Sequence, residues 1–298
     1  MLISYGIKDN NIDVTDICLS MLTRNNIIII PSCDHNRAAL FTDPLLGTLK
    51  SIFISVDNEN SKEFDETYNI KINIIDNTIN LIRYDDEEIN NKILNLQSKL
   101  TLKYGNFDEE LPEQKMAARY LTGKEKVLEI GGNIGRNSLI IASIVENNNF
   151  LTLESDLNIA NQLIENRDLN NFNFYIESAA LSNRKLIQKG WDTIPSDTLP
   201  DGYKWVNTVT SSYLKNKYNI EFDTLILDCE GAFYYILMDM PEILDNIKLI
   251  IMENDYYEIF KKQYVDEILK KNNFYRDYVE AGGWGPCINC FFEVWKKI

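Results

Sequence analysis

The chain has 298 residues, of which 45% are hydrophobic and 25% charged, as in globular proteins with one large domain or two smaller ones. Lys and Arg number 30 against 45 Asp and Glu, and the net charge of −15 opposes a phosphate backbone, so no nucleic-acid partner is expected. No apolar run is long enough to span a bilayer, and the first residues lack the features of a secretory signal. We therefore expect a cytoplasmic protein without a membrane partner.

Residues 1–85 predict a small β-rich accessory domain. Runs of strand-forming residues occur at Asn26–Ile30, Ser51–Val56 and Asn69–Ile75, and turn-rich pieces separate them. Residues 86–111 begin with a polar, helix-compatible segment and predict a helical linker. The accessory domain is a candidate for homodimer formation, glycan binding or docking to a partner enzyme.

From residue 112 to residue 298 the pattern changes to alternating strands and helices. Short apolar strands with amphipathic helices between them predict a mostly parallel sheet covered on both faces, which is a Rossmann-like α/β domain. The last two strands are close in sequence and predict an antiparallel hairpin at one edge of a seven-stranded sheet. The predicted strands are Lys126–Ile130, Phe150–Glu154, Phe172–Glu177, Thr224–Asp228, Leu249–Glu253, Phe274–Val279 and Phe291–Trp295.

A glycine-rich loop follows the first of these strands, in the segment Val127-Leu-Glu-Ile-Gly-Gly-Asn-Ile-Gly-Arg-Asn137. Its glycines permit a tight turn and a close approach to a ligand, although glycine spacing alone fits a turn of any α/β protein. Glu154 lies about 20 residues further on, where an acid binds the ribose hydroxyls of an adenosine cofactor. The loop reads Glu-x-Gly-x-Asn-x-Gly rather than the dinucleotide pattern Gly-x-Gly-x-x-Gly. These features favour S-adenosylmethionine over a nicotinamide or flavin cofactor.

Two acids follow the fourth strand, in the segment Asp228-Cys-Glu-Gly231. Ligands bind at the carboxyl edge of an open α/β sheet, although both acids would also fit a capping role at the next helix. Methyl transfer to a hydroxyl requires the acceptor to lose its proton. His35, the single histidine, belongs to the accessory region, so carboxylates or a metal must take that role. The candidate catalytic residues are Asp228, Glu230 and Asp255.

The fifth strand ends in Glu253-Asn254-Asp255. An acid after the fourth strand and an acid–amide pair after the fifth resemble the magnesium site of catechol O-methyltransferase-like enzymes. Hard oxygen ligands suit Mg²⁺, which would bind the acceptor oxygen and lower its pKa. Asp228, Glu253 and Asn254 form the candidate metal triad, with Glu230 or Asp255 as base. In a metal-free alternative, Asp228 holds the amino group of the cofactor or acts as the base itself.

The chain resembles the FkbM-type methyltransferases in five ordered segments, which extend from about Gln114 to the C-terminus. The segments are Glu129-Ile-Gly-Gly-Asn-Ile-Gly135, Leu153-Glu154, Ser178-Ala-Ala-Leu-Ser182, Phe222-Asp-Thr-Leu-Ile-Leu-Asp-Cys-Glu-Gly231 and Ile251-Met-Glu-Asn254. The resemblance implies a class I methyltransferase fold, S-adenosylmethionine as cofactor and acceptor hydroxyls on sugars and related metabolites. Glu129 stands where the family usually has Asp, and Gly132 where it usually has Ala. The sequence style is also similar to that of homologues from large DNA viruses.

The resemblance further implies a cofactor site made of the glycine loop and the ends of the next two strands. Glu154 is expected to take the ribose. Ser178 and Ala179 are expected to line the adenine, with a plain strand-to-helix connection as the alternative. The residues expected at the methionine end are Glu129, Gly131, Asn133 and Gly135.

Other residues are weaker candidates for the acceptor side of the site. A Gly-rich loop at Gly282–Cys287 precedes the last strand, and aromatic faces suit sugar stacking. The helix before the first strand also borders the pocket in such folds. The residues concerned are Trp284, Tyr256, Tyr257, Gln114 and Arg119.

The predicted activity is therefore transfer of a methyl group from S-adenosylmethionine to a hydroxyl of a sugar or glycan. An N- or protein-methyltransferase with the same cofactor site is the alternative enzyme. The third hypothesis is a catalytically inactive, cofactor-binding assembly protein. The inactive-protein hypothesis is disfavoured because all three acids, Asp228, Glu230 and Glu253, are present.

Overall fold

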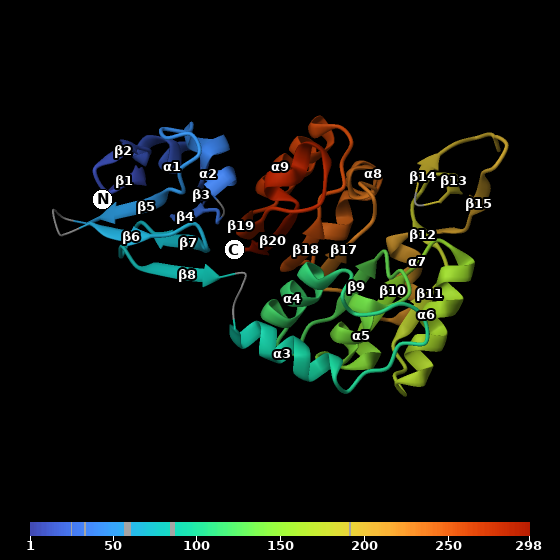
Figure 1. Cartoon of the computed structure of the whole chain (residues 1–298). Helices are drawn as coiled ribbons and strands as arrows, with labels where there is room; N and C mark the ends of the chain where they lie inside the picture. Colours follow the sequence, from blue (N-terminus) through green and yellow to red (C-terminus); the bar gives the residue numbers. More distant parts are fainter. Residues whose placement is uncertain (25, 33, 57–60, 84–86, 191) are drawn as a thin grey trace.

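A computed structural model describes residues 1–24, 26–32, 34–56, 61–83, 87–190 and 192–298. Figure 1 shows two parts side by side, a small N-terminal part and a larger part in which helices cover a central sheet. The expected domain boundary between residues 85 and 86 lies outside the described residues. Within the described ranges, no helix has both the length and the apolar character needed to cross a bilayer.

The N-terminal part consists of two four-stranded antiparallel sheets that share one core. The sheets have the orders β2-β1-β5-β6 and β3-β4-β7-β8. Branched side chains from both sheets, such as Ile28, Ile52 and Ile70, are fully buried in this core, where branched residues favour strands. The strands are β1 (Leu2–Ile7), β2 (Asn10–Asp13), β3 (Thr23–Arg24), β4 (Ile27–Ile30), β5 (Ser51–Ser55), β6 (Lys62–Phe64), β7 (Tyr68–Asn73) and β8 (Ile79–Arg83).

Two helices in this part differ from the sequence-based expectation. Helix α1 (Thr15–Met21) is not predicted, and α2 (Asp34–Phe41) begins where a turn is expected. Arg37 in α2 is fully buried, and its guanidinium donates hydrogen bonds of 2.8 Å each to the backbone carbonyls of Pro31 and Tyr68. These contacts come from segments distant along the chain, so the local sequence pattern could not reveal the helix.

The larger part is built on a seven-stranded sheet with the order β11-β10-β9-β17-β18-β20-β19. The first five strands are parallel, β20 is antiparallel to β18, and β19 is antiparallel to β20. This arrangement confirms the expected class I, Rossmann-like fold with an antiparallel edge hairpin. The strands are β9 (Val127–Ile130), β10 (Phe150–Leu153), β11 (Tyr175–Glu177), β17 (Thr224–Leu227), β18 (Leu249–Glu253), β19 (Phe274–Glu280) and β20 (Phe292–Lys297).

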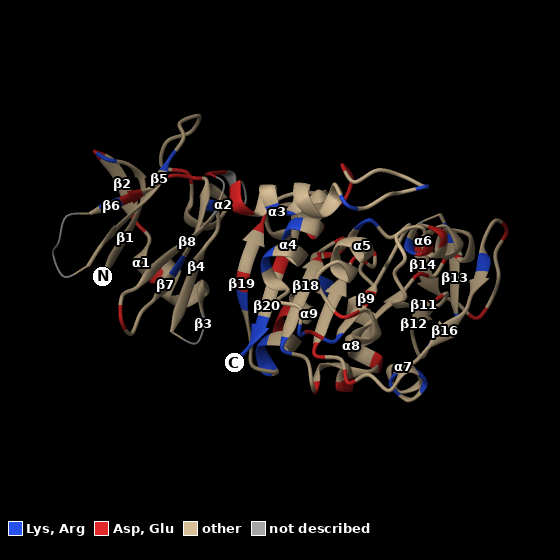
Figure 2. Cartoon of the chain, turned by 90° about the horizontal axis from the view of Figure 1, so that it is seen from below, with Lys and Arg blue, Asp and Glu red and all other residues tan. Residues whose placement is uncertain are grey.

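Helices cover both faces of this sheet, so the central strands β9 and β17 are buried along their whole length. Figures 1 and 2 show α3, α4 and α5 on one face and α8 and α9 on the other. The linker expected at residues 86–111 contains α3 and ends where α4 begins. The helices are α3 (Glu87–Gln97), α4 (Leu111–Tyr120), α5 (Arg136–Ala142), α6 (Leu157–Leu169), α7 (Ser211–Tyr218), α8 (Phe233–Asp239) and α9 (Ile259–Lys271).

A β-rich insert between β11 and β17 is absent from the sequence-based prediction. Its main feature is a three-stranded antiparallel sheet with the order β14-β13-β15. A short parallel pair, β12 and β16, joins this insert to the larger part. The strands are β12 (Ala180–Leu181), β13 (Leu186–Lys189), β14 (Asp192–Pro195), β15 (Lys204–Val206) and β16 (Thr208–Val209).

The N-terminal part packs against the edge strand β19, as Figures 1 and 2 show. Asp277 of β19 is buried at this junction and forms an ion pair with Lys71 of β7. Tyr120 donates a hydrogen bond of 3.0 Å to Asp277, and Lys296 lies 3.1 Å from its carboxylate. An uncovered edge strand is prone to pair with other chains, so the N-terminal part shields the outer edge of the sheet.

Candidate active site

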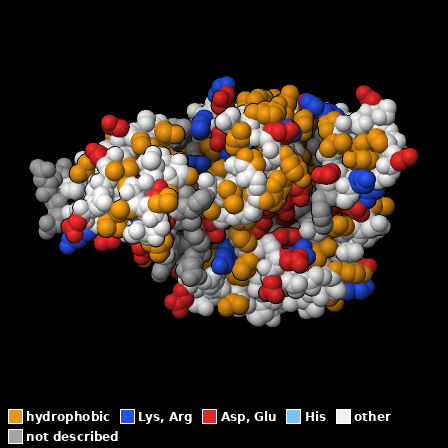
Figure 3. Space-filling model, turned by 45° about the horizontal axis from the view of Figure 1, so that its top comes forward, with side chains coloured by type: hydrophobic (Ala, Val, Ile, Leu, Met, Phe, Trp, Pro, Cys, Tyr) orange, Lys and Arg blue, Asp and Glu red, His pale blue; other side chains and the backbone are white. Residues whose placement is uncertain are grey.

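A cavity of about 430 Å³ lies at the carboxyl ends of the parallel strands β9, β10, β17 and β18. The insert and the first residues of α4 complete its wall. Open α/β sheets bind ligands at this edge, and the volume is typical of a small-molecule site. On the face seen in Figure 3, acidic side chains gather in a hollow that hydrophobic side chains border.

The glycine-rich loop between β9 and α5 borders one end of the cavity through Gly131 and Asn133. Gly131 has φ of +94°, and a Cβ at this position would lie 1.5 Å from the carbonyl oxygen of Asp228. Gly135 precedes α5 with φ of +97°, but it faces Leu163 and is not among the residues that line the cavity. These glycines are therefore required by the packing of the loop itself. Their presence alone does not indicate a ligand.

Glu154 follows β10 and lines the cavity beside this loop. Its carboxylate accepts hydrogen bonds from the backbone N–H groups of Asn133 (2.9 Å) and Asp156 (2.7 Å), one on each oxygen. Burial raises the pKa of Glu154. Each oxygen retains a further lone pair, so the backbone fixes the carboxylate while it can still accept hydrogen bonds from a diol. This geometry is compatible with the expected ribose contact.

The other residues that were expected to bind the cofactor do not all line the cavity. Ala179 lines the cavity together with Ala180, whereas Ser178 does not. Glu129 is fully buried under the glycine loop, where it accepts a hydrogen bond from the Ser138 hydroxyl. Burial raises the pKa of Glu129 to about 7. Glu129 does not line the main cavity, so its position supports the loop rather than a direct cofactor contact.

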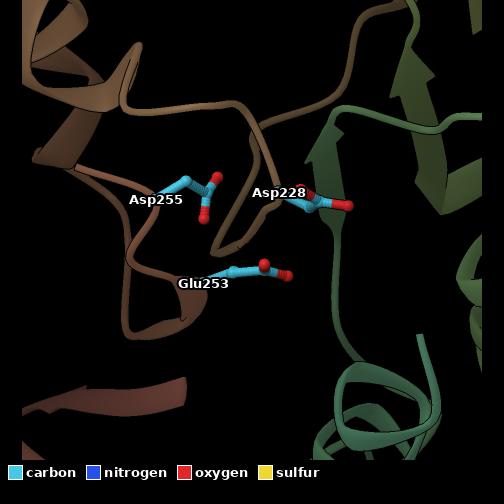
Figure 4. A group of neighbouring side chains, drawn as sticks. All are labelled: Asp228, Glu253 and Asp255. Carbon is cyan, nitrogen blue, oxygen red and sulfur yellow. The ribbon is translucent and has the colours of Figure 1, made fainter. Parts of the chain in front are cut away.

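Three carboxylates lie close together beside the cavity, and two of them, Asp228 and Glu253, line it. Asp228 follows β17, Glu253 ends β18, and Asp255 lies two residues further on; their nearest carboxylate oxygens are all within 4.8 Å of one another. Figure 4 shows the three side chains converging from the ends of two neighbouring strands. We call this group the acidic cluster.

Burial and mutual repulsion raise the pKa of each carboxyl in the acidic cluster. The pKa of Asp228 lies well above its ordinary value because of burial and then the charge of Asp255. The pKa of Glu253 is also strongly raised by burial, by a hydrogen bond with the Glu113 carboxyl and by Asp228. Burial and the nearby Glu230 raise the pKa of Asp255. Such a cluster either holds protons at neutral pH or favours a bound cation.

The predicted metal ligand Asn254 is held by hydrogen bonds to the segment before β20. Its side-chain amide donates to the carbonyl of Cys290 (2.6 Å), its backbone N–H donates to Phe291 (2.8 Å), and it is not among the residues that line the cavity. Alternate side chains of an extended segment share one side, so Glu253 and Asp255 point the same way. The structure therefore places Asp255 beside Asp228 and Glu253, while the Oδ1 of Asn254 is buried without a hydrogen-bond partner.

Glu230 lies at the rim of the cavity and is exposed. Its backbone has a left-handed conformation with φ of +50°, which is uncommon for a residue other than glycine. The backbone N–H of Glu230 donates to Oδ2 of Asp255 (2.9 Å). Asp255 thus holds the loop that carries both Asp228 and Glu230.

Several cavity residues were not singled out from the sequence. Glu110 and Glu113 come from the start of α4, and Gln188 comes from the insert. The sequence pattern pointed to this helix but favoured Gln114, which is fully buried and hydrogen-bonded to Gln97 (2.8 Å). The hydrophobic periodicity of a short helix does not show which polar residue faces a cavity. For Gln188 no sequence signal was present, because β13 is defined by its pairing with other short strands.

The charged residues that line the cavity are predominantly acidic. Among the described residues that line it, Arg184 is the sole cation, and its guanidinium pairs with the carboxylate of Asp239 through two contacts of 2.5 and 2.7 Å. The cavity therefore suits a positively charged ligand better than an anionic one. The acidic lining residues are Glu110, Glu113, Glu154, Asp228, Glu230, Asp239 and Glu253.

The weaker acceptor-side candidates lie outside the cavity wall. Tyr257 and Trp284 contact each other at 4.6 Å between ring centroids, and both are exposed. Tyr256 is buried, and Arg119 lies over the ring of Tyr278. Neither these residues nor Gln114 is among those that line the cavity.

No protein-family model matches the chain, and no curated protein matches it. Among solved structures, the chain is similar to a ribosomal protein L11 methylase from Lactobacillus delbrueckii subsp. bulgaricus, with 12% identity over 66% of this chain and 82% of that one and a TM-score of 0.41. An O-methyltransferase from Bacillus cereus in complex with SAH shows 13% identity over 72% and 93%, with a TM-score of 0.40. An rRNA methylase from Streptococcus thermophilus shows 11% identity over 62% and 93%, with a TM-score of 0.40. Likeness at this level carries no argument about activity or acceptor, and the fold assignment rests on the strand order of the sheet itself.

Proposed function

We propose that the chain is an S-adenosylmethionine-dependent methyltransferase that methylates a hydroxyl of a sugar or glycan. The observation that supports this most directly is that one cavity joins the glycine loop and Glu154 to the acidic cluster across the carboxyl edge of the sheet. The assignment to O-methylation of a sugar follows from the FkbM-type resemblance of the sequence.

The residues of the cavity fit the proposed cofactor. Glu154 is fixed by the backbone and retains lone pairs for the ribose hydroxyls. Gly131 and Asn133 bring backbone to the cavity wall where the methionine end would lie. The sulfonium and ammonium groups of the cofactor are both positive, which matches a cavity with many carboxylates.

The cofactor, when bound, supplies a methyl group on a positively charged sulfur. The chain would orient the acceptor hydroxyl toward that methyl group and remove its proton. In the metal-free form of the proposal, Asp228 is the base because it lines the cavity and its backbone directly contacts Gly131 of the cofactor loop. Its raised pKa makes it a stronger base than an ordinary aspartate. Glu230 at the rim and Asp255 behind it are proposed to position the acceptor and the loop.

We further propose that the acidic cluster binds a divalent cation such as Mg²⁺ through Asp228, Glu253 and Asp255. The support beyond clustering is that Oδ1 of Asp255 and Oε2 of Glu113 are buried without a hydrogen-bond partner. Buried acceptors in native proteins normally have a partner, and a cation would provide one. Carboxylate oxygens are suitable ligands for Mg²⁺, which would polarise an acceptor oxygen when bound.

The proposed activity can be tested with methyl-labelled S-adenosylmethionine and a panel of nucleotide sugars, free glycans, amines, peptides and RNA. Label transfer to a carbohydrate hydroxyl is the expected result. Transfer to amines or peptides would instead support the N- or protein-methyltransferase alternative, and transfer to RNA would contradict the expectation from the acidic cavity. Binding of S-adenosylhomocysteine without turnover on any acceptor would favour the inactive assembly protein. Absence of binding in calorimetry would overturn the methyltransferase assignment.

A further inference from the structure

The insert supplies the wall of the cavity next to Glu154. Two contacts tie it to the loop that follows β10. The side-chain nitrogen of Gln188 donates a hydrogen bond of 3.0 Å to the Ser155 hydroxyl, and Lys204 forms an ion pair with Asp156. Gln188 of β13 therefore lies immediately beside the residue that follows Glu154.

Gln188 carries a hydrogen-bond acceptor that the protein itself does not use. Its side chain is 4% exposed and lines the cavity. Its nitrogen is bonded to Ser155, whereas its Oε1 is buried and has no hydrogen-bond partner. An unpaired buried carbonyl is unfavourable, so a ligand N–H group that reaches this oxygen after a small movement of the side chain gains affinity.

Apolar side chains line the cavity together with Thr193, which pairs with Gln188 across β13 and β14. Leu186 precedes Gln188 by two residues on β13 and therefore lies on the same side of that strand. A wall of apolar side chains with an amide acceptor suits a flat heterocycle that carries an N–H donor. The apolar residues that the insert and the ends of β10 and β11 contribute to the cavity are Leu153, Ala179, Ala180, Leu181, Leu186 and Pro195.

We propose that Gln188 recognises the adenine base of the cofactor by accepting a hydrogen bond from its exocyclic amine. The proposal rests on the proposed function, because it uses Glu154 as the ribose-binding residue. The base is attached directly to the ribose, so it must occupy space adjacent to Glu154, where Ser155 and Gln188 form the wall. A 6-oxo purine presents an acceptor in place of the amine, and an acceptor facing Gln188 Oε1 would be rejected. Gln188 thus determines which nucleoside the cavity accepts.

Calorimetry on the full chain can test this with two nucleosides, S-adenosylhomocysteine and its 6-oxo analogue S-inosylhomocysteine. Gln188→Met removes the acceptor at similar side-chain length, and Gln188→Glu retains an acceptor oxygen. Lys189→Met is the matched control, because Lys189 is the next residue of β13, is exposed and does not line the cavity. Thermal unfolding of every variant confirms folding.

We expect the wild type and Lys189→Met to prefer the adenosyl compound by about tenfold or more, in line with one hydrogen bond and one avoided clash. Gln188→Met should lose about tenfold in adenosyl affinity with little change for the inosyl compound, and Gln188→Glu should keep the preference. A preference that persists in Gln188→Met, or disappears in a folded Gln188→Glu protein, overturns the role of Gln188 and leaves the proposed function intact. A wild type that binds neither compound overturns both proposals.

Discussion

The backbone carbonyl of Asp228 faces Gly131 so closely that a Cβ on Gly131 would lie 1.5 Å from its oxygen. The two residues follow neighbouring parallel strands, β9 and β17, whose register pairs Ile130 with Leu227. The N–H of Asp228 donates to the carbonyl of Ile130 (3.0 Å) and continues that ladder. The proposed cofactor loop and the proposed base therefore meet at one rigid backbone junction, which is a suitable scaffold for holding two reactants in line.

This junction predicts a severe effect of Gly131→Ala. The methyl group would collide with the Asp228 carbonyl, and φ of +94° would be strained for alanine. We expect a loss of stability of roughly 2–4 kcal/mol and more than about tenfold weaker binding of S-adenosylhomocysteine. Gly47→Ala is the control, since Gly47 has a similar φ of +76° but no atom within 4 Å of its Cβ position, and should cost only about 1 kcal/mol. A Gly131→Ala protein that behaves like Gly47→Ala would contradict the tight junction.

Glu154→Ala should weaken S-adenosylhomocysteine binding by at least about tenfold, because charge-assisted hydrogen bonds are each worth roughly 1.5–3 kcal/mol. Some loss of stability is also expected, since Glu154 accepts from the backbone of Asn133 and Asp156. Glu154→Gln keeps one acceptor oxygen, so its affinity for S-adenosylhomocysteine should lie between those of the wild type and Glu154→Ala. Calorimetry on folded variants measures the effect, and full affinity in Glu154→Ala would remove the ribose assignment.

The larger part of the fold could be predicted because its strands are short apolar runs with clear ends. Leu249–Glu253 has the same bounds in the prediction and the structure, and Phe150–Glu154 differs from β10 by one residue. The insert could not be predicted, because β13, β14 and β15 have only three or four residues each, too few to show a clear strand period. These strands are stabilised by pairing with one another and by contacts with the loop after β10. Such contacts leave no local pattern in the sequence.

The candidate site was predictable only in part for a related reason. The glycine loop and Glu154 follow ordered strands, so their place at the sheet edge followed from the fold. The approach of Asp255 to Asp228 and Glu253 depends on the direction of the chain after β18, which the residue types do not fix. Glu129 has the residue type of a ligand-binding acid, but it lies under the loop.

Glu129 predicts a pH-dependent stability. Its pKa is raised from about 4.5 in the unfolded chain to about 7 by burial, so the folded protein holds this proton more tightly. The stabilisation is complete below the unfolded pKa and is lost as the pH rises through the folded value. Glu129→Gln mimics the protonated side chain, so it should match the wild type near pH 4.5 and be more stable by up to about 3 kcal/mol at pH 8. Denaturant unfolding of cofactor-free protein in chelator measures this, and a difference that stays constant with pH would contradict it.

The division into two parts predicts that a fragment of residues 87–298 folds and binds S-adenosylhomocysteine with an affinity within about threefold of the full chain. The proposed cofactor residues all lie in this fragment. Asp277 loses its ion pair with Lys71 but keeps its ion pair with Lys296 and its hydrogen bond with Tyr120. The fragment should self-associate more strongly, because β19 loses its cover. Calorimetry and light scattering test these points. An unfolded fragment would show that the two parts form one cooperative unit.

The last prediction concerns the divalent cation. If Asp228, Glu253 and Asp255 hold it, activity should be lost in excess chelator and return with Mg²⁺ or Mn²⁺. Asp255→Asn should weaken metal binding and reduce turnover by about a hundredfold, whereas S-adenosylhomocysteine affinity should change little. Asn254→Ala is the matched neighbour, because the side-chain nitrogen of Asn254 donates to the carbonyl of Cys290. It should retain metal binding and most of the activity in a folded protein.

Direct titration with Mn²⁺, followed by electron paramagnetic resonance, separates metal binding from catalysis. We expect one bound ion in the wild type and in Asn254→Ala, and none in Asp228→Asn or Asp255→Asn. Full activity in chelator together with an inactive Asp228→Asn protein would eliminate the cation and leave Asp228 as the direct base. In that case the raised pKa of Asp228 has a kinetic consequence: turnover should increase as the pH rises through that raised pKa, because only the ionised carboxylate accepts the proton. A pH profile of turnover measured in chelator therefore tests whether Asp228 is the direct base.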